Sequence, residues 1–198
     1  MSADIEDRPS SWFERLRAST LAVACVLFAA AFLARPVRAD TFTADATVTR
    51  ANGTQTSARL TAVVQSFATD AERDALIAAV RKGGTSARDL LSSRGDAGAI
   101  EVGPKRTPIK YAYTRPVGSG QLITVITAEP IHFVGGDLPD AKPKAGYDFG
   151  LVLLELDASK PGSGEVAPAA KIRVDAGGAI VTEDYGSEVV RLSNVVRR

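Results

Sequence analysis

Residues Leu151–Leu156 read LVLLEL, a run whose side chains, Glu155 excepted, are apolar at both odd and even positions. Successive side chains of a β-strand point to opposite faces of its sheet, so an apolar pattern at both parities needs cover on both faces. This stretch therefore predicts the central strand of the fold.

Segments on either side of this run have the period-two pattern of half-buried strands. Residues 109–114 alternate apolar with polar or small side chains, and the turn Gly118–Gly120 returns the chain into 122–127, which predicts a hairpin. Pro130 interrupts the pattern, so 131–134 is expected to be a separate or bulged edge segment. Further strands are expected at Phe42–Arg50, Ala58–Phe67, Ile100–Gly103, Lys171–Val174, Ala179–Glu183 and Val189–Val196, the first two as a hairpin.

The period changes after this first hairpin, which predicts helices. Thr69 and Glu72 have the spacing of a capping box, in which their side chains satisfy free backbone N–H groups of a first helical turn. The stretch Lys82–Gly84 places a cation and two glycines at the expected end. A second short helix is expected over Ser86–Ser93, with its first residue and Asp89 as another capping box. We therefore expect an α+β fold: a mostly antiparallel sheet, either a sandwich or an open barrel, with a one- to two-helix insertion after the first hairpin.

Residues 1–39 are interpreted as a signal peptide. Leu21–Ala34 is an apolar run preceded by two arginines, and it is shorter than the roughly 20 residues needed to cross a bilayer. Val37–Ala39 ends in a small residue, as a cleavage site requires. We expect cleavage after Ala39, which leaves 40–198 as a single β-rich globular domain in the periplasm or outside the cell. The alternative is a membrane anchor that is not cleaved.

Composition excludes several kinds of site from residues 40–198. The only Cys, Met and Trp lie within 1–39, and His132 is the only histidine of the chain. A mature chain without cysteine has no disulfide, thiolate nucleophile or cysteine metal site, and one histidine cannot supply a two-histidine site. The chain carries 24 Lys+Arg against 23 Asp+Glu, with the signs interspersed. This balance offers no broad basic surface for nucleic acid or an anionic membrane, and we expect no metal and no cofactor.

Further segments carry a resemblance: GAIEVG at Gly98–Gly103, TPIKYAYT at Thr107–Thr114, EPIHF at Glu129–Phe133, GYDFGLVLLELD at Gly146–Asp157, AAKIRVD at Ala169–Asp175 and VVRLSNV at Val189–Val195. Together they are similar to a family of small exported bacterial proteins of unknown function. The resemblance implies export and a compact β-rich fold. Because the family has no assigned activity, it implies no catalytic residue.

His132 is the strongest candidate for acid–base chemistry, because imidazole titrates near neutral pH. Glu129 and Asp137 are close enough in sequence to orient it. A catalytic triad also needs a nucleophile, and the one glycine–serine–glycine stretch, within Val117–Gln121, lacks the nucleophile-elbow spacing and forms a hairpin turn. We therefore favour a solvent-facing or hydrogen-bonded His132 and expect no catalytic residue.

Tyr111 and Tyr113 share one face of their predicted strand. Aromatic side chains at this spacing form either a stacking platform for a ligand or the core face of a hairpin. We favour the core, with the hydroxyls at its rim and with Lys110 and Arg115 on the opposite or flanking surface.

These observations favour an exported, non-enzymatic binding or scaffolding module of the bacterial cell envelope. Its partner is expected to be an unknown protein or small-molecule ligand, with no nucleic acid and, after signal cleavage, no membrane. One alternative is a small periplasmic hydrolase or isomerase that uses His132 with Glu129 or Asp137. Another is a carrier of a small apolar ligand in the mouth of a β-barrel.

Overall fold

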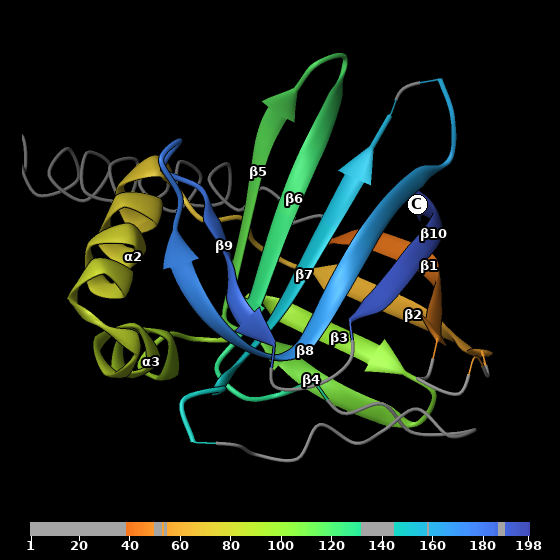
Figure 1. Ribbon diagram of the computed structural model, residues 1–198. Helices are drawn as coiled ribbons and strands as arrows, with labels where there is room; N and C mark the ends of the chain where they lie inside the picture. Colours follow the sequence, from red (N-terminus) through yellow and green to blue (C-terminus); the bar gives the residue numbers. More distant parts are fainter. Residues whose placement is uncertain (1–38, 50–52, 54, 132–144, 158, 186–188) are drawn as a thin grey trace, which may run out of the picture. The chain divides into compact units, whose positions relative to one another are not determined.

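The computed structural model describes residues 39–49, 53, 55–131, 145–157, 159–185 and 189–198. Strands and helices follow one another as β1 (Asp40–Thr49), β2 (Gln55–Val64), α2 (Asp70–Lys82), α3 (Gly84–Ser92), β3 (Gly98–Val102), β4 (Lys105–Ile109), β5 (Tyr111–Val117), β6 (Gly120–Thr127), β7 (Phe149–Leu156), β8 (Gly162–Val174), β9 (Ile180–Tyr185) and β10 (Val190–Arg197) (Figure 1).

These strands form one antiparallel sheet in the order β4-β3-β2-β1-β10-β8-β7-β6-β5, with β9 paired to β8 off this path. The order contains two meanders, β1–β4 and β5–β8, which β10 joins by pairing with both β1 and β8. Phe42 of β1 lies opposite Arg197, and the Arg198 N–H donates to the Thr41 carbonyl at 2.8 Å. The α+β prediction is confirmed: the fold is mostly antiparallel strand, with two helices between the first hairpin and the later strands.

The two ends of the strand order meet at Lys110, because β4 ends at Ile109 and β5 begins at Tyr111. The Lys110 N–H donates to the Ile126 carbonyl of β6 at 3.0 Å. The sheet is therefore a single curled half-barrel rather than a sandwich (Figure 1). The expectation of one strand through 109–114 is wrong, because the chain turns a corner at Lys110 and its flanking side chains enter different cores.

Two apolar cores lie on opposite faces of the sheet. The inner core packs side chains from both meanders, Ile109 among them, and the outer core packs α2 and α3 against β5–β9. Strand β7 supplies both: Val152 and Leu154 belong to the inner core, whereas Phe149 and Leu151 belong to the outer one. The prediction that this stretch is central and buried on both faces is confirmed.

Strand β8 begins at Gly162, well before the predicted strand Lys171–Val174, although glycine and proline, which are typical of loops, are frequent in residues 159–168. The reason lies in the neighbouring strands. A Cβ on Gly164 would come within 2.2 Å of the Leu153 carbonyl oxygen of β7, so this close approach excludes a side chain. Pro168 lies where the β7–β8 register shifts, at an irregularity that tolerates a missing N–H.

Helix α2 begins as the sequence predicted. The Thr69 N–H donates to a Glu72 carboxylate oxygen at 2.8 Å, and the Glu72 N–H donates to the Thr69 hydroxyl at 3.3 Å. Helix α3 differs from the prediction: it begins at Gly84 rather than Ser86 and has no side-chain cap, because the chain turns directly at Gly83 with a φ of 127°. Neither described helix is long and apolar enough to span a membrane.

Candidate functional site

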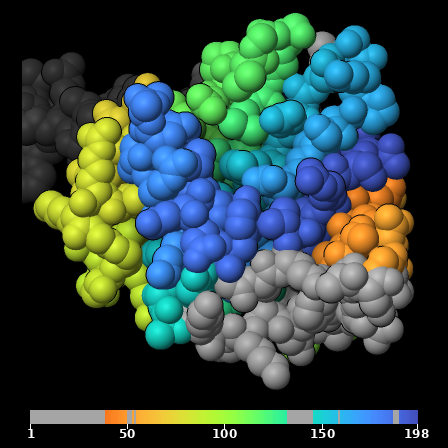
Figure 2. Space-filling view, viewed as in Figure 1, coloured from red at the N-terminus to blue at the C-terminus, as the bar shows by residue number. Residues whose placement is uncertain are grey.

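A cleft lies on the outer face of the sheet, and we call it the arginine cleft. Its walls are α2, the β5–β6 hairpin and the turn from β8 to β9, which border one another on the surface (Figure 2). Its volume is about 470 Å³, within the range of roughly 300–1,000 Å³ that small-molecule sites occupy. The lining residues are Arg73, Asp74, Ile77, Ala78, Arg81, Tyr111, Tyr113, Arg115, Thr124, Gly177, Gly178, Ala179 and Ile180.

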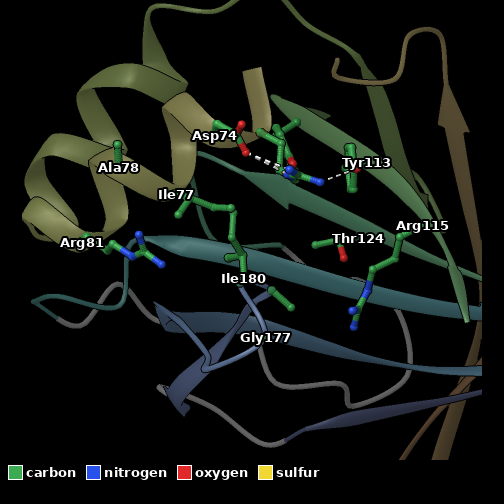
Figure 3. Close-up of a pocket in the computed structure, with 13 residues that line it drawn as sticks. Asp74, Ile77, Ala78, Arg81, Tyr113, Arg115, Thr124, Gly177 and Ile180 are labelled. Atoms are coloured by element: carbon green, nitrogen blue, oxygen red, sulfur yellow. Dashed lines mark hydrogen bonds and ion pairs between the residues drawn. The ribbon is translucent and has the colours of Figure 1, made fainter. Parts of the chain in front are cut away.

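The α2 wall follows from the periodicity of the helix. Arg73, Ile77 and Arg81 recur every four residues, so they share one helical face. The adjoining face carries Leu76 and Val80 into the outer core, and Ile77 packs at the edge of that core, which fixes the rotation of the helix about its axis. Ile77 and Arg81 extend from the helix toward the cleft (Figure 3).

Arg73 is held by its own neighbours. Its Nε and Nη2 donate to one oxygen of Asp74 at 3.1 and 2.9 Å, and its Nη1 donates to the Tyr113 hydroxyl at 2.8 Å. That hydroxyl in turn donates to Asp70 at 2.8 Å. The hydrogen bonds, that to Asp74 foremost, raise the pKa of Arg73. This network fastens the first turns of α2 to β5.

The β5 wall alternates as a strand does, so Tyr111, Tyr113 and Arg115 share a face. The Tyr111 ring is 2% exposed and stacks on the Tyr113 ring with a centroid distance of 6.4 Å. Burial raises the pKa of Tyr111, so its hydroxyl stays protonated at neutral pH. The core interpretation holds for Tyr111, and Tyr113 packs against the edge of the same core, while both rings and Arg115 line the cleft. The placement of Arg115 on the opposite or flanking surface is therefore wrong.

Two guanidinium groups of the cleft remain unpaired within the described part of the chain. No carboxylate there forms an ion pair with Arg81 or Arg115, whereas Arg73 has Asp74. Figure 3 shows Arg81 and Arg115 entering from opposite sides, with Ile77 and Ile180 between them. The arrangement can hold an anion without a metal, because each guanidinium offers several fixed N–H donors.

A second hollow shares Tyr111 with the arginine cleft, and we call it the ion-pair hollow. Its volume is about 410 Å³. Glu72 is paired with Arg94, and the Lys110 ammonium lies 2.7 Å from Asp96 and donates to the Arg94 carbonyl at 3.1 Å. Each of its charged side chains thus has a partner of opposite sign, so the hollow carries no unpaired charge.

Of the three residues named as acid–base candidates, the structure places one. Glu129 is exposed after β6 and borders a small hollow with Lys110 and Pro108. Its backbone carbonyl accepts a hydrogen bond from the Thr127 hydroxyl at 2.5 Å. His132 and Asp137 lie outside the described residues.

No cluster of three or more metal-ligating side chains is found among the described residues. Asp157, which follows β7, binds its own turn: the backbone N–H and hydroxyl of Ser159 donate to one of its oxygens at 2.9 and 2.7 Å. These bonds, the hydroxyl foremost, lower the pKa of Asp157.

The arginine cleft is not apparent in the sequence, because its walls come from three segments that are distant along the chain, 73–81, 111–124 and 177–180. One local signal was present. Arg73, Ile77 and Arg81 at a spacing of four put two cations on one helical face, and Arg115 stands in phase with Tyr111 and Tyr113. The third wall of the arginine cleft is the turn from β8 to β9. Its position depends on the pairing of these two strands, which no local sequence pattern indicates.

Comparison with known proteins adds no name to this geometry: no family model, curated protein or solved structure matches the chain. The resemblance to small exported bacterial proteins stays a prediction.

Proposed function

We propose that this chain is an exported, non-enzymatic binding module of the bacterial cell envelope, and that its ligand occupies the arginine cleft. The observation that carries the proposal is that Arg81 and Arg115, on the walls of a cleft of ligand size, form no ion pair with any described side chain. Ligand sites are typically concave and largely apolar, with a few polar groups that fix orientation. Here Ile77 and Ile180 supply the apolar surface, and the two guanidinium groups supply the polar contacts.

The chemistry of these side chains favours binding over catalysis. A guanidinium is protonated at all physiological pH values, so it attracts and orients an anion but does not accept a proton from it. Tyr111 is a neutral phenol at physiological pH, and burial raises its pKa further, while Asp74 is held by two hydrogen bonds from Arg73. These groups can therefore fix a ligand in place without acting as a general base.

Export is proposed from the sequence and agrees with the start of the sheet. Strand β1 begins at Asp40, so cleavage after Ala39 would leave the strand whole. Asp40 also forms an ion pair with Arg197 of β10, at 2.7 Å, which anchors the new end of the chain. Intact-mass analysis of protein from the envelope fraction tests cleavage; a mass that still includes Leu21–Ala34 would show an uncleaved anchor instead.

A ligand screen with a blocked cleft tests the binding function. Ala78 is exposed and lines the cleft, so Ala78→Trp fills the space without disturbing the core. Ala75→Trp adds the same ring to an exposed position of α2 that does not line the cleft. Calorimetry with anionic, neutral and cationic small molecules is expected to give a ligand that Ala78→Trp no longer binds and Ala75→Trp still binds. Binding that both variants retain, or no ligand at all, would overturn the proposal.

A further inference from the structure

The unpaired cations of the arginine cleft stand on different walls. Arg81 belongs to the last turn of α2, whereas Arg115 belongs to the C-terminal half of β5. Both side chains are exposed, so a ligand can reach them. Their donors are available because hydrogen bonds and ion pairs within the described chain engage Arg73 but neither of these two.

The surface between the two cations is apolar. Ile180 is 6% exposed and packs in the outer core, and Ile77 is half-buried against that core. Figure 3 shows both isoleucines between Arg81 and Arg115. A ligand that touches both guanidinium groups therefore has to carry its charges at two ends and lay an apolar segment over the isoleucines.

Carboxylate is the anion that this donor geometry favours for a small ligand. The planar fork of a guanidinium matches the two oxygens of a carboxylate, and such charge-assisted pairs are roughly twice as strong as neutral hydrogen bonds. Arg73 adds a third positive charge to the lining, and Asp74, which binds Arg73, supplies the single negative one. The cleft thus has an excess of positive charge even with Arg73 paired.

On the basis of the binding function proposed above, we propose that the ligand is a small dicarboxylate whose two acid groups are joined by an apolar chain. One carboxylate pairs with Arg81, the other pairs with Arg115, and the chain between them packs on Ile77 and Ile180. The hydroxyl of Thr124, on the floor of the cleft, stays hydrated beside the chain (Figure 3).

Isothermal titration with a series of α,ω-dicarboxylates tests this class of ligand. Each diacid is compared with the monocarboxylate and the diol of the same chain length. We expect one chain length to bind best, and to bind at least tenfold tighter than its monocarboxylate, because a second charge-assisted contact contributes at least about this factor. The diol is expected not to bind measurably.

Single substitutions then assign the two ends. Arg81→Gln and Arg115→Gln are each expected to lower the affinity for the diacid by about 10- to 100-fold, toward that of the monocarboxylate. Arg191→Gln, which removes an exposed arginine of β10 outside the cleft, is expected to leave it unchanged. Thermal melts check that the variants fold. Arg81→Lys and Arg115→Lys keep the positive charge but lose the planar fork of the guanidinium. We expect their affinity for the diacid to lie between those of the wild type and of the glutamine variants.

The outcomes separate this inference from the function on which it rests. Equal affinity for mono- and dicarboxylates, or a loss in only one of the two glutamine variants, overturns the two-ended ligand. A neutral or cationic ligand that Ala78→Trp excludes also overturns it, yet leaves the cleft as a binding site. Failure to find any ligand that Ala78→Trp excludes removes both proposals.

Discussion

The arginine cleft and the ion-pair hollow share Tyr111, but they differ in whether their charged side chains are paired. In the ion-pair hollow Glu72 and Asp96 each meet a cation, and two of the contacts tie distant segments together. In the arginine cleft, Arg81 and Arg115 have no such partner among the described side chains. A charge that is paired inside the fold contributes to holding the fold, whereas an unpaired one is available to a ligand. The comparison therefore separates a structural region from a candidate binding region on one surface.

The largest effect is expected where the two regions meet. Tyr111→Ala removes a buried ring from the outer core and a wall from both hollows, and should destabilise the fold by about 3–5 kcal/mol. Tyr111→Phe keeps the ring and serves as the control. Denaturant unfolding measures both. A loss below about 1 kcal/mol for the alanine variant would mean that the two regions do not share a packed wall.

A smaller loss of stability is expected in the ion-pair hollow. Glu72→Ala removes half of the α2 capping box and the partner of Arg94, which together should cost about 1–2 kcal/mol because both contacts are partly exposed.

The stability that Glu72 contributes should also depend on pH. Hydrogen bonds from Thr69, that of its backbone N–H foremost, lower the pKa of Glu72 in the folded state. Its contribution is therefore present above the unfolded pKa, about 4.3, and is lost as the pH falls through the lower folded value. Unfolding experiments between pH 7 and pH 3 should show the wild type and Glu72→Ala converging at the acid end. Parallel curves would contradict this assignment.

In the arginine cleft, substitutions should hardly change the free energy of unfolding. Arg81→Gln and Arg115→Gln remove exposed side chains that form no ion pair within the described part of the chain, so the free energy of unfolding should change by less than about 0.5 kcal/mol. A slight gain in stability would fit relief of repulsion within the cleft. A loss above about 1 kcal/mol in either variant would place that arginine among the structural residues and weaken the comparison.

The smallest effect is expected at the residue that the sequence singled out for chemistry. We predict that His132→Ala leaves folding and ligand binding unchanged, because the described walls of the arginine cleft come from α2, the β5–β6 hairpin and the β8–β9 turn. Wild type and variant are compared by calorimetry and across a panel of hydrolysis substrates. An activity of the wild type that falls by about two orders of magnitude in the variant would favour the hydrolase or isomerase instead.

Local patterns were enough to predict much of the fold. The parity of Leu151–Leu156 indicated a strand buried on both faces, and the Thr69–Glu72 pair indicated where α2 begins. Errors arose where a distant strand decides the conformation. Gly164 looks like a loop residue until the Leu153 carbonyl is placed beside it, and the corner at Lys110 exists only because the ends of the sheet meet there.

The candidate site was harder to predict than the fold. His132 stands out in the sequence because it is the only histidine, and Glu129 and Asp137 lie close to it. Arginine is common, so no arginine of the cleft stands out by itself. Only the packing of α2 beside β5 brings Arg81 and Arg115 to one hollow. The choice between sandwich and barrel had the same difficulty, because it depends on strand order rather than on the pattern within any strand.

The pairing of β1 with β10 predicts the order in which the strands pair during folding. It joins residues 40–49 to residues 190–197, so the two meanders can each form hairpins early but cannot be joined between β1 and β8 until β10 arrives. Contacts between such distant segments close slowly, because the intervening chain has to be ordered first. Pulse-labelled hydrogen exchange during refolding should show the β1–β2 and β6–β7 amides protected before those between β1 and β10. If the chain is exported N-terminus first, as proposed above, its sheet would therefore stay open until β10 has also crossed the membrane.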